Sequence, residues 1–445
     1  MKRLALAVAA FVVLACTQPV DVPTPPPPPT SPPPAPPPPP PPPPGPTWPF
    51  VEVGTASDHI AALAFNDSDV VVGRSDLHPI LAQGAHARAL SLNDGIAEAI
   101  TKLGAISGIM NPLGQCSPQC APWQLRIWDA AGERSVPLPT RRLGGPKVLA
   151  MNSRGDVLVV DSIQYDVFMT GAHEDSITDM VSFLFRDGQF QKLSSLHPLY
   201  RSTFAAALND QGQAVGMSAV GHKDSGDSPY DGSQNVFHPF LWKDGVLQDL
   251  GVFGRSDASC TLGMAPRSCA SGAALGLNNR GWVVGYSEND AMIKRPFVWH
   301  DGVMSEIDAF PGDSAFARLI NDQGVVAGDN DREAFLWDNG RVTVLGSLGG
   351  VALRVTAIDQ RGDVAGTGFA ADGTQHAFVW RNGQMIDLGI PIPGGCAAQP
   401  LTINEKGEVL ITVLMQYCAP QWNTPLSFMG YAYVQRAVIW HPPSP

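Results

Sequence analysis

Three groups of acidic side chains are the residues most able to hold a cation. Asp224, Asp227 and Asp231 fall within eight residues, and Gly226 and Gly232 leave that segment free to turn. Clustered carboxylate oxygens are the ligands that calcium prefers. Because the spacing matches no strict calcium loop, we expect only weak Ca²⁺ binding at these three aspartates and no other cofactor.

The other two acidic groups are more dispersed. One comprises His173, Glu174, Asp175 and Asp179, and the other comprises Asp329, Asp331 and Glu333. Loop carboxylates are mostly exposed to water. We therefore expect these side chains to be solvated.

Cys16 is the candidate for lipid attachment. Lys2 and Arg3 precede an apolar stretch, residues 4–14, that is too short to span a bilayer. The stretch ends in Val-Leu-Ala-Cys, which resembles the bacterial lipobox, in which cleavage precedes an acylated cysteine. Residues 1–15 would then be a signal peptide, and the alternative is an ordinary signal peptide cut nearby. Thr17 at the next position favours the outer membrane or cell surface, so the membrane is an expected partner through the lipid.

The six remaining cysteines are predicted to form disulfides, because export leads to an oxidising compartment. They are Cys116, Cys120, Cys260, Cys269, Cys396 and Cys418. No histidine cluster accompanies them, which argues against zinc. Six cysteines allow many pairings, and we favour the sequential one because each pair falls in one loop or in two neighbouring loops.

Motifs of catalytic sites are missing from the sequence. It contains no Gly-x-Ser-x-Gly, no His-Glu-x-x-His and no phosphate-binding loop. No catalytic residue is assigned, and a protein without enzymatic activity is favoured. Acids and bases contributed by distant strands would escape such a search.

The elements that position these residues are repeated. An Asn-x-x-Gly motif recurs as LNDQGQAVG (208–216), LNNRGWVVG (277–285), INDQGVVAG (320–328) and IDQRGDVAG (358–366), with weaker copies from residues 65, 100, 151 and 403. Each copy is followed by a second motif, as in HPFLWKDG from His238 and HAFVWRNG from His376. Asn, Asp and Gly supply turn chemistry, and the flanking residues are β-branched, aromatic or small.

This repeat predicts an all-β fold. Each copy indicates two hairpins in series, and one such sheet must stack on neighbours to bury both faces. Eight copies match a β-propeller of four-stranded blades. The last copy lacks its fourth strand, and residues 50–54 (FVEVG) precede the first copy, so we expect this N-terminal strand to complete the last blade and close the ring.

Three recurring side chains are given structural roles by their places in the repeat. The turn residues are Asn209, Asn278, Asn321, Asp359 and Asn404; the strand residues are Trp242, Trp299, Trp337 and Trp380; and the histidines are His78, His238 and His376. We expect hairpin turns from the first group and packing between blades from the second. The shared position of the histidines, at the start of the third strand, favours structure over catalysis.

Residues 50–440 resemble the extracellular HAF-repeat proteins of bacteria, named for the three residues seen here as His376-Ala377-Phe378. The copies at 320–340 and 358–383 lie closest to that consensus. The resemblance implies a surface location and a propeller-like repeat, and it implies no catalytic mechanism.

The domain organisation follows from these features. Residues 16–49 are the lipidated cysteine and a proline-rich stalk, in which residues 22–49 would extend roughly 80 Å as polyproline II. Residues 50–445 form the repeat domain. Turns within hairpins are short, whereas the long connections at 110–123, 161–180, 217–236, 253–273 and 414–433 share the opposite face.

Function is expected on those long loops, because loops on a rigid scaffold commonly carry binding. We expect a surface lipoprotein that binds a protein or glycan. The alternative is a carbohydrate-active enzyme, a glycoside hydrolase or lyase, with carboxylates in the central channel; a purely structural envelope component is a third candidate. The net charge of −12 argues against nucleic acid.

Overall fold

A computed structural model describes most of the repeat domain. The described residues are 50–55, 60–91, 94–110, 123–139, 146–168, 174–198, 200–223, 235–257, 260, 264–265, 269–415 and 435–443. The chain divides into two units, Met1–Gly45 and Pro46–Pro445, and all described residues lie in the second. The elements there are all strands, and no described helix could cross a membrane.

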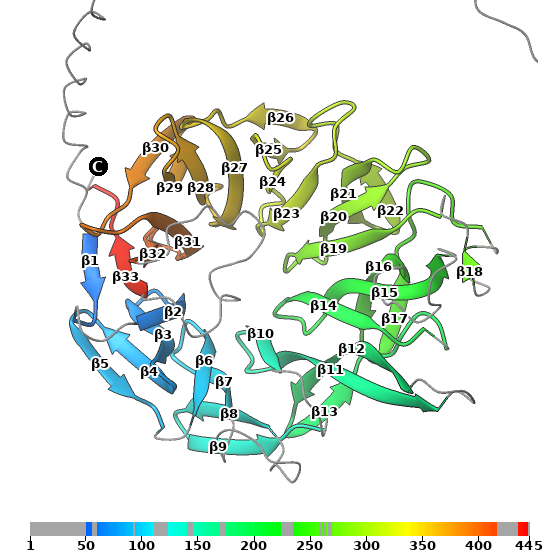
Figure 1. Cartoon of the computed structure of the whole chain (residues 1–445), viewed down its shortest axis with the longest axis horizontal. Coiled ribbons are helices and arrows are strands. Elements are labelled where there is room, and N and C mark those ends of the chain that lie inside the picture. Colours follow the sequence, from blue (N-terminus) through cyan, green and yellow to red (C-terminus); the bar gives the residue numbers. More distant parts are fainter. Residues whose placement is uncertain are drawn as a thin grey trace, which may run out of the picture. The chain divides into compact units, whose positions relative to one another are not determined.

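The strands form four-stranded antiparallel sets, which we number in chain order (Figure 1). Set 1 is β2 (Ile60–Phe65), β3 (Val70–Ser75), β4 (His78–Gln83) and β5 (His86–Ala89); set 2 is β6 (Gly95–Ile100), β7 (Ile106–Met110), β8 (Gln124–Asp129) and β9 (Gly132–Pro137). Set 3 is β10 (Lys147–Met151), β11 (Val157–Phe168), β12 (Glu174–Arg186) and β13 (Gln189–Lys192); set 4 is β14 (Thr203–Leu208), β15 (Ala214–Lys223), β16 (Asn235–Lys243) and β17 (Val246–Asp249).

The second half of the chain repeats this order. Set 5 is β19 (Gly272–Leu277), β20 (Val283–Glu288), β21 (Lys294–His300) and β22 (Val303–Glu306); set 6 is β23 (Phe316–Ile320), β24 (Val326–Asp329), β25 (Ala334–Asp338) and β26 (Arg341–Val344). Set 7 is β27 (Gly349–Ile358), β28 (Val364–Ala370), β29 (Gln375–Arg381) and β30 (Gln384–Gly389); set 8 is β31 (Ala397–Ile403), β32 (Val409–Leu414), β33 (Gln435–Trp440) and β1 (Phe50–Val53). One parallel pair, Gln375↔Ala397, joins sets 7 and 8 in a single sheet.

The hairpin turns have the backbone that their residue types predicted. Between the third and fourth strands of set 6, Asn339 and Gly340 have φ of 47° and 90°, and Asn382 and Gly383 of set 7 have 51° and 79°. Two successive positive φ values define the type I′ turn, whose twist matches that of the flanking strands. The Trp-x-x-Gly motif therefore forms tight hairpins, as the sequence predicted.

The first strand of every set contains the same irregularity. Its register with the second strand shifts by one residue, for example between Ala317 and Leu319 in set 6 and between Ala97 and Ala99 in set 2, and β27 of set 7 has an additional shift between Gly349 and Leu353. The other six first pairs shift at the equivalent position. A bulge bends its strand and leaves one residue outside the ladder. These first strands lie nearest the common centre of the sets (Figure 1).

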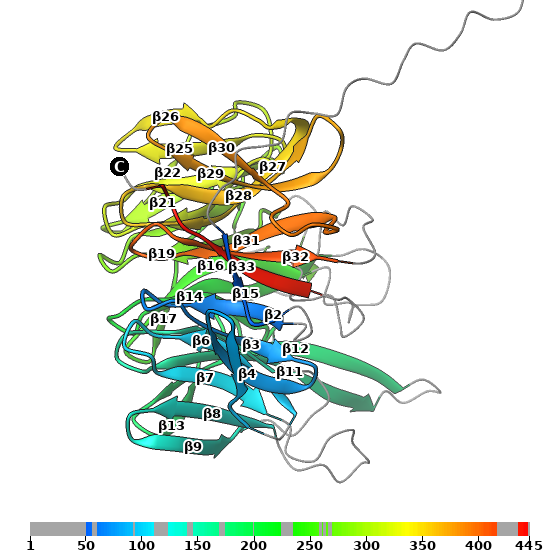
Figure 2. The same cartoon turned by 90° about the vertical axis from the view of Figure 1, so that its left-hand side faces the viewer.

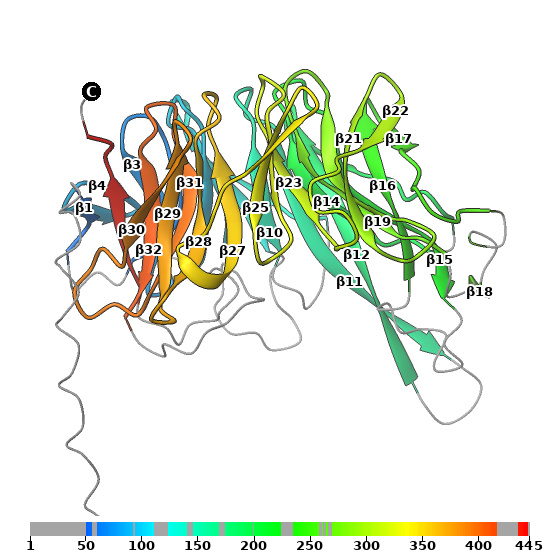
Figure 3. The same cartoon turned by 90° about the horizontal axis from the view of Figure 1, so that it is seen from above.

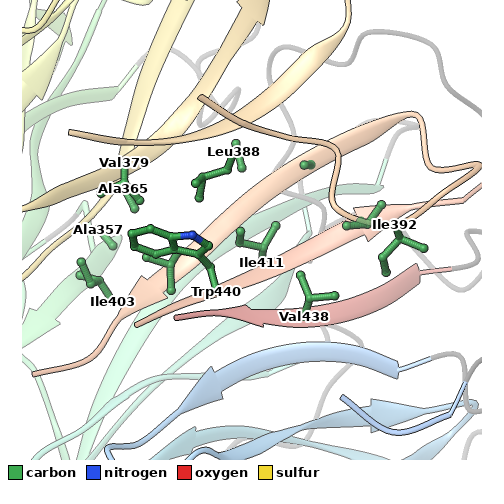
Figure 4. Close-up of a cluster of buried hydrophobic side chains, with 13 residues drawn as sticks. Ala357, Ala365, Val379, Leu388, Ile392, Ile403, Ile411, Val438 and Trp440 are labelled. Carbon is green, nitrogen blue, oxygen red and sulfur yellow. The ribbon is translucent and has the colours of Figure 1, made fainter. Parts of the chain in front are cut away.

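Consecutive sets pack face to face through apolar side chains, and the side view shows them as layers (Figure 2). Trp440 of β33 is fully buried in a cluster with Ile411 and Val438 of its own set and Ala365 and Val379 of set 7 (Figure 4). Val53 of β1 and Ile439 of β33 join a second cluster with residues of set 1. The two ends of the described chain are thus packed against each other.

The tight turns lie at one edge of the sets, which we call the turn edge, and the second strand of each set ends at the opposite edge, which we call the loop edge (Figure 3). The segment 161–180, expected to be a loop, is largely strand: β11 and β12 stay paired as far as Phe168↔Glu174. This two-stranded hairpin extends beyond the loop edge (Figure 3). The sequence signal was missed because turn residues are sparse over this stretch and its charges suggested solvated loop.

Near the loop edge, the short strand β18 (Met264–Ala265) pairs in parallel with His222 and Lys223 of β15. Cys260 and Cys269, which flank that strand in the sequence, form a disulfide, and both are fully buried. The predicted pairing of these two cysteines is therefore confirmed.

Candidate functional site at the turn edge

The repeated asparagine is a buried hydrogen-bonding centre. Asn278 is 3% exposed, and its Oδ1 accepts the backbone N–H groups of Arg280 at 3.0 Å and Trp282 at 2.9 Å. Its Nδ2 donates to the carbonyl oxygen of Asn321, in the next set, at 3.0 Å. The predicted turn role is confirmed, and the same side chain also bonds set 5 to set 6.

This bond between sets recurs along the chain. Asn152 donates to the carbonyl of Asn209 at 3.0 Å, Asn209 to that of Asn278 at 3.1 Å, and Asn321 to that of Asp359 at 2.9 Å. Sequence reasoning missed it, because a turn motif read alone gives no sign of what lies beside it. The recurrence of an amide, which can donate and accept at once, was the available signal.

The residue after each asparagine builds a second chain of bonds. Asp210 accepts the backbone N–H of Ser153, and Asn279 accepts that of Asp210, both at 2.8 Å. Asp322 accepts the N–H of Asn279 at 2.7 Å, and Gln360 accepts that of Asp322 at 3.1 Å. Polar groups from sets 3 to 7 thus converge at the turn edge.

These side chains line a cavity of about 320 Å³, to which set 2 contributes Lys102 and Thr101. The Lys102 ammonium forms an ion pair with Glu405 of set 8, and both side chains are largely exposed. Burial acts to raise the pKa of Asp210, but hydrogen bonds from Ser153 and Asn279 and the charge of Lys102 outweigh it and lower the pKa.

The cavity has poor geometry for acid–base catalysis. Asn279 Nδ2 bonds Asp210 Oδ2 at 3.1 Å and Asp322 Oδ2 at 3.0 Å, so an amide lies between the two carboxylates. A glycosidase needs one carboxyl with a raised pKa as its acid, whereas the pKa of Asp210 is lowered. The arrangement is better suited to fixing the sets in place.

A raised pKa occurs elsewhere, in the first strand of set 2. The Glu98 carboxylate accepts the backbone N–H of Val148, in set 3, at 2.7 Å. Burial raises the pKa of Glu98 to about 8, although the Val148 bond and the charge of Lys147 act in the opposite direction. Burial also lowers the pKa of Lys147. Glu98 and Lys147 are therefore two partly desolvated groups whose charges act on each other across two sets, here called the Glu98–Lys147 couple, and no sequence motif indicated them.

The third acidic group differs from the solvated carboxylates that were expected. Asp329 is 0% exposed, and Arg318 bonds both of its oxygens at 2.7 Å. Asp329 Oδ2 also accepts the backbone N–H of Val355, in set 7, at 3.1 Å. Arg318 is the bulged residue of β23, because the register shifts between Ala317 and Leu319. The register shift thus accounts for the proximity of Arg318 to Asp329, the last residue of β24. The expectation of solvation was wrong for Asp329 and right for Asp331, whose side chain is 61% exposed.

The repeated histidines have structural partners. His238 Nδ1 lies 2.8 Å from Asp249 and His376 Nδ1 lies 3.0 Å from Asp387, in each case between the third and fourth strands of one set. The hydrogen bond to Asp387 raises the pKa of His376. The predicted structural role is confirmed for both histidines.

The other sequence predictions fall as follows. Trp242 and Trp299 are buried in clusters that each include residues of two sets, which confirms packing between sets. Cys396 is disulfide-bonded, and its expected partner Cys418 lies outside the described residues. Cys16, Cys116, Cys120, Asp224, Asp227 and Asp231 also lie outside them. Among the residues that are described, no cluster of three or more His, Cys, Asp or Glu side chains could hold a metal ion.

Comparison with known proteins gives no family. No family model matches the chain, and no curated protein does. Among solved structures it is similar to a puromycin-hydrolysing peptidase of Mycobacterium tuberculosis, with 13% identity, 84% of this chain and 62% of that one covered, and a TM-score of 0.41. An acylaminoacyl peptidase of Pyrococcus horikoshii has 11% identity, with 82% of this chain and 57% of that one covered, and a TM-score of 0.43. A polysaccharide lyase has 9% identity, with 87% of this chain and 90% of that one covered, and a TM-score of 0.41.

The chain spans less than two thirds of the length of either peptidase. At these identities and TM-scores the similarities carry no functional conclusion.

Proposed function

We propose that this chain is a bacterial surface lipoprotein whose repeat domain is a closed, eight-bladed β-propeller that binds a protein or glycan at its loop edge. The eight four-stranded sets, each with the same bulge in its first strand, support the blade count. The resemblance to HAF-repeat proteins agrees with display on the cell surface.

Closure is supported by the register of β1. In set 8, Glu52 of β1 lies opposite Val438 of the third strand. The same register is found between the third and fourth strands of other sets, where Asp249 lies opposite Phe240 and Asp387 lies opposite Phe378. Glu52 also forms an ion pair with Arg436, in the position of the His238–Asp249 pair. The sequence Glu-Val-Gly at 52–54 therefore takes the place of Asp-Leu-Gly elsewhere, and Gly54, with φ of 73°, matches Gly251, with 78°.

The observation that carries the binding function is the difference between the two edges. At the turn edge, asparagines and their neighbours are bonded from set to set. The loop edge carries the β11–β12 extension and the disulfide-linked connection at Cys260 and Cys269. A rigid scaffold that presents variable segments on one edge is the common design of a binding protein.

Binding can be tested on the full chain with panels of glycans and surface proteins. We expect replacement of residues 164–178 by Asn-Gly, which joins the pair Ile163 and Asp179 in a two-residue turn and shortens the β11–β12 hairpin, to weaken binding without lowering the melting temperature. Leu103→Ser at the turn edge, where Leu103 is 93% exposed, is the matched control and should leave binding intact. Binding that is lost in the control and kept in the shortened variant would place the ligand at the turn edge instead.

The lipid anchor has its own test. Cys16→Ser should release the protein from the membrane fraction and abolish incorporation of labelled fatty acid. A variant that stays in the membrane, together with a wild type that takes up no label, would disprove the anchor.

A carbohydrate-active enzyme is the second candidate, favoured by the Glu98–Lys147 couple. A carboxyl with a pKa of about 8 could donate a proton near neutral pH. The test is release of reducing ends or unsaturated products from polysaccharides by wild type and by Glu98→Gln. Activity that survives this substitution would exclude Glu98 as the acid, and no activity on any substrate would leave the binding protein as the better proposal.

A further inference from the structure

Two arginines of the innermost strands stand in contrasting situations. Arg318, on β23, is fully engaged: it bonds both oxygens of Asp329 and also reaches Asp331 at 3.1 Å. Its guanidinium also stacks on the Phe316 ring, 4.7 Å from the centroid. This side chain is therefore fixed and has little capacity to bind anything further.

Arg354, on β27, has no such partners. Its side chain is partly exposed, and among the described residues that side chain makes no hydrogen bond and no ion pair. Burial, and then the neighbouring charge of Arg318, lower its pKa. A partly desolvated guanidinium without an acceptor is unfavourable, so a partner from outside the chain would stabilise it.

The chemistry of Arg354 indicates a carboxylate as that partner. A guanidinium offers parallel N–H donors that match the two oxygens of a carboxylate. Asp329 cannot fill this role, because Arg318 and the Val355 N–H already occupy both of its oxygens. A ligand carboxylate would find Arg354 free and the surrounding pairs already formed.

The local charge argues against a densely charged ligand. Asp329 and Asp331 balance Arg318 and Arg354, and the whole chain carries −12. A run of acidic residues in a peptide, or a nucleic acid, would be repelled by the exposed Asp331. An isolated carboxylate flanked by neutral hydroxyl groups would not be repelled, and this is the pattern of a uronic acid within a polysaccharide. The Asp331 carboxylate could accept a bond from such a hydroxyl.

We propose that Arg354, on the inner strand β27 of set 7, is the carboxylate-binding residue of a site for acidic glycans that it forms with Asp331, in the connection between β24 and β25 of set 6. This inference rests on the proposed binding function and names the ligand class. Arg354 is partly exposed and Asp331 is exposed, so both side chains can be reached from the solvent.

The test uses the full chain with two probes, trigalacturonate and its methyl ester, measured by calorimetry. We expect the wild type to bind the acid at least about tenfold more tightly than the ester, because only the acid offers a bidentate partner. Arg354→Met should remove that preference and Arg354→Lys should retain part of it. Arg341→Met, at the start of the outer strand β26, is the matched control and should bind like wild type.

The outcomes separate this inference from the proposed function. Equal affinities for acid and ester, or an Arg354→Met variant that binds the acid like wild type, would overturn the role of Arg354. If neither probe bound but another glycan or a protein did bind, the role of Arg354 would also be overturned. The proposed binding function would then remain. Melting temperatures of all variants should match the wild type, which ensures that a lost preference does not reflect unfolding.

Discussion

Two seams between neighbouring sets differ in how they are held at the turn edge. Between sets 4 and 5, Asn209 bonds its own turn and donates to the carbonyl of Asn278. Between sets 2 and 3 the equivalent residue is Thr101, whose hydroxyl accepts the N–H of Ala105 at 3.1 Å. Within its own turn, the threonine hydroxyl accepts a hydrogen bond as the asparagine Oδ1 does in other sets. No bond from the Thr101 side chain to set 3 is found among the described residues.

The second seam is correspondingly more open. A groove of about 290 Å³ lies there, lined by Thr101, Leu103, Ile127, Met151 and Phe185 among others. Its polar connection is made deeper in the seam, by the Glu98 carboxylate on the Val148 N–H. The comparison indicates that the repeated turn and the bond between sets are two tasks of one side chain that can be separated. The predictions that follow weaken or restore each task in turn.

The most severe change removes the fourth strand of set 8. A chain that begins at Thr55 lacks β1 and loses the ladder to β33, the Glu52–Arg436 ion pair and the buried Val53. We expect it to lose on the order of 5 kcal/mol or more of unfolding free energy, or to aggregate. A chain that begins at Thr47 is the control. Equal denaturation midpoints for the two would contradict the closure by β1.

A smaller loss of unfolding free energy should follow from breaking a seam that is held by an asparagine amide. Asn278→Ala removes two turn bonds and the bond to Asn321 and leaves buried groups unsatisfied, which should cost about 2–4 kcal/mol. Asn278→Thr, which copies Thr101, should cost roughly half as much, because the hydroxyl replaces only the acceptor. Urea denaturation measures both. If Thr proves as harmful as Ala, the two tasks are not separable.

The open seam should be sensitive to pH. Folded Glu98 keeps its proton up to about pH 8, whereas the unfolded chain releases it near the ordinary pKa of 4.5. The folded state therefore binds more protons between these values, and stability must fall as pH rises through this window. Glu98→Gln retains an acceptor for Val148 and should remove this loss, making the variant more stable than wild type by about 1–2 kcal/mol at pH 9.

Thermal or urea unfolding from pH 4 to pH 9 checks this prediction. The stability advantage of the Gln variant over the wild type should shrink toward pH 4, where the side chain at position 98 is uncharged in both proteins. An advantage that is constant with pH would show that Glu98 does not titrate in this range.

The smallest expected effect is a gain. Thr101→Asn should supply the amide that holds the four seams from set 3 to set 7 and bond the carbonyl of Asn152, stabilising the domain by about 0.5–1.5 kcal/mol. Leu103→Ser, in the same turn but without a bonding role, is the matched control and should change stability little. An Asn variant no more stable than the wild type would show that the open seam is set by packing and not by the missing donor.

The sequence determined the local structure of this protein. Asn-x-x-Gly and Trp-x-x-Gly predicted tight turns, because Asn bonds its own backbone and Asn-Gly tolerates successive positive φ, and the flanking residues predicted strands. The repeat and the spare segment at residues 50–54 predicted four-stranded sets and an N-terminal strand for the last one. Those properties depend on neighbours along the chain, so the sequence carries them directly.

Only the tertiary structure decided what the sets do to one another. The bond from Asn209 to Asn278 spans 69 residues and that from Glu98 to Val148 spans 50, and neither leaves a local pattern. The bulge places Arg318 beside Asp329, whereas Arg354 lies in the regular part of β27, two residues before the equivalent bulge, and its side chain has no such bond among the described residues. Burial, register and packing between sets create these differences, and they arise only when distant strands are brought side by side.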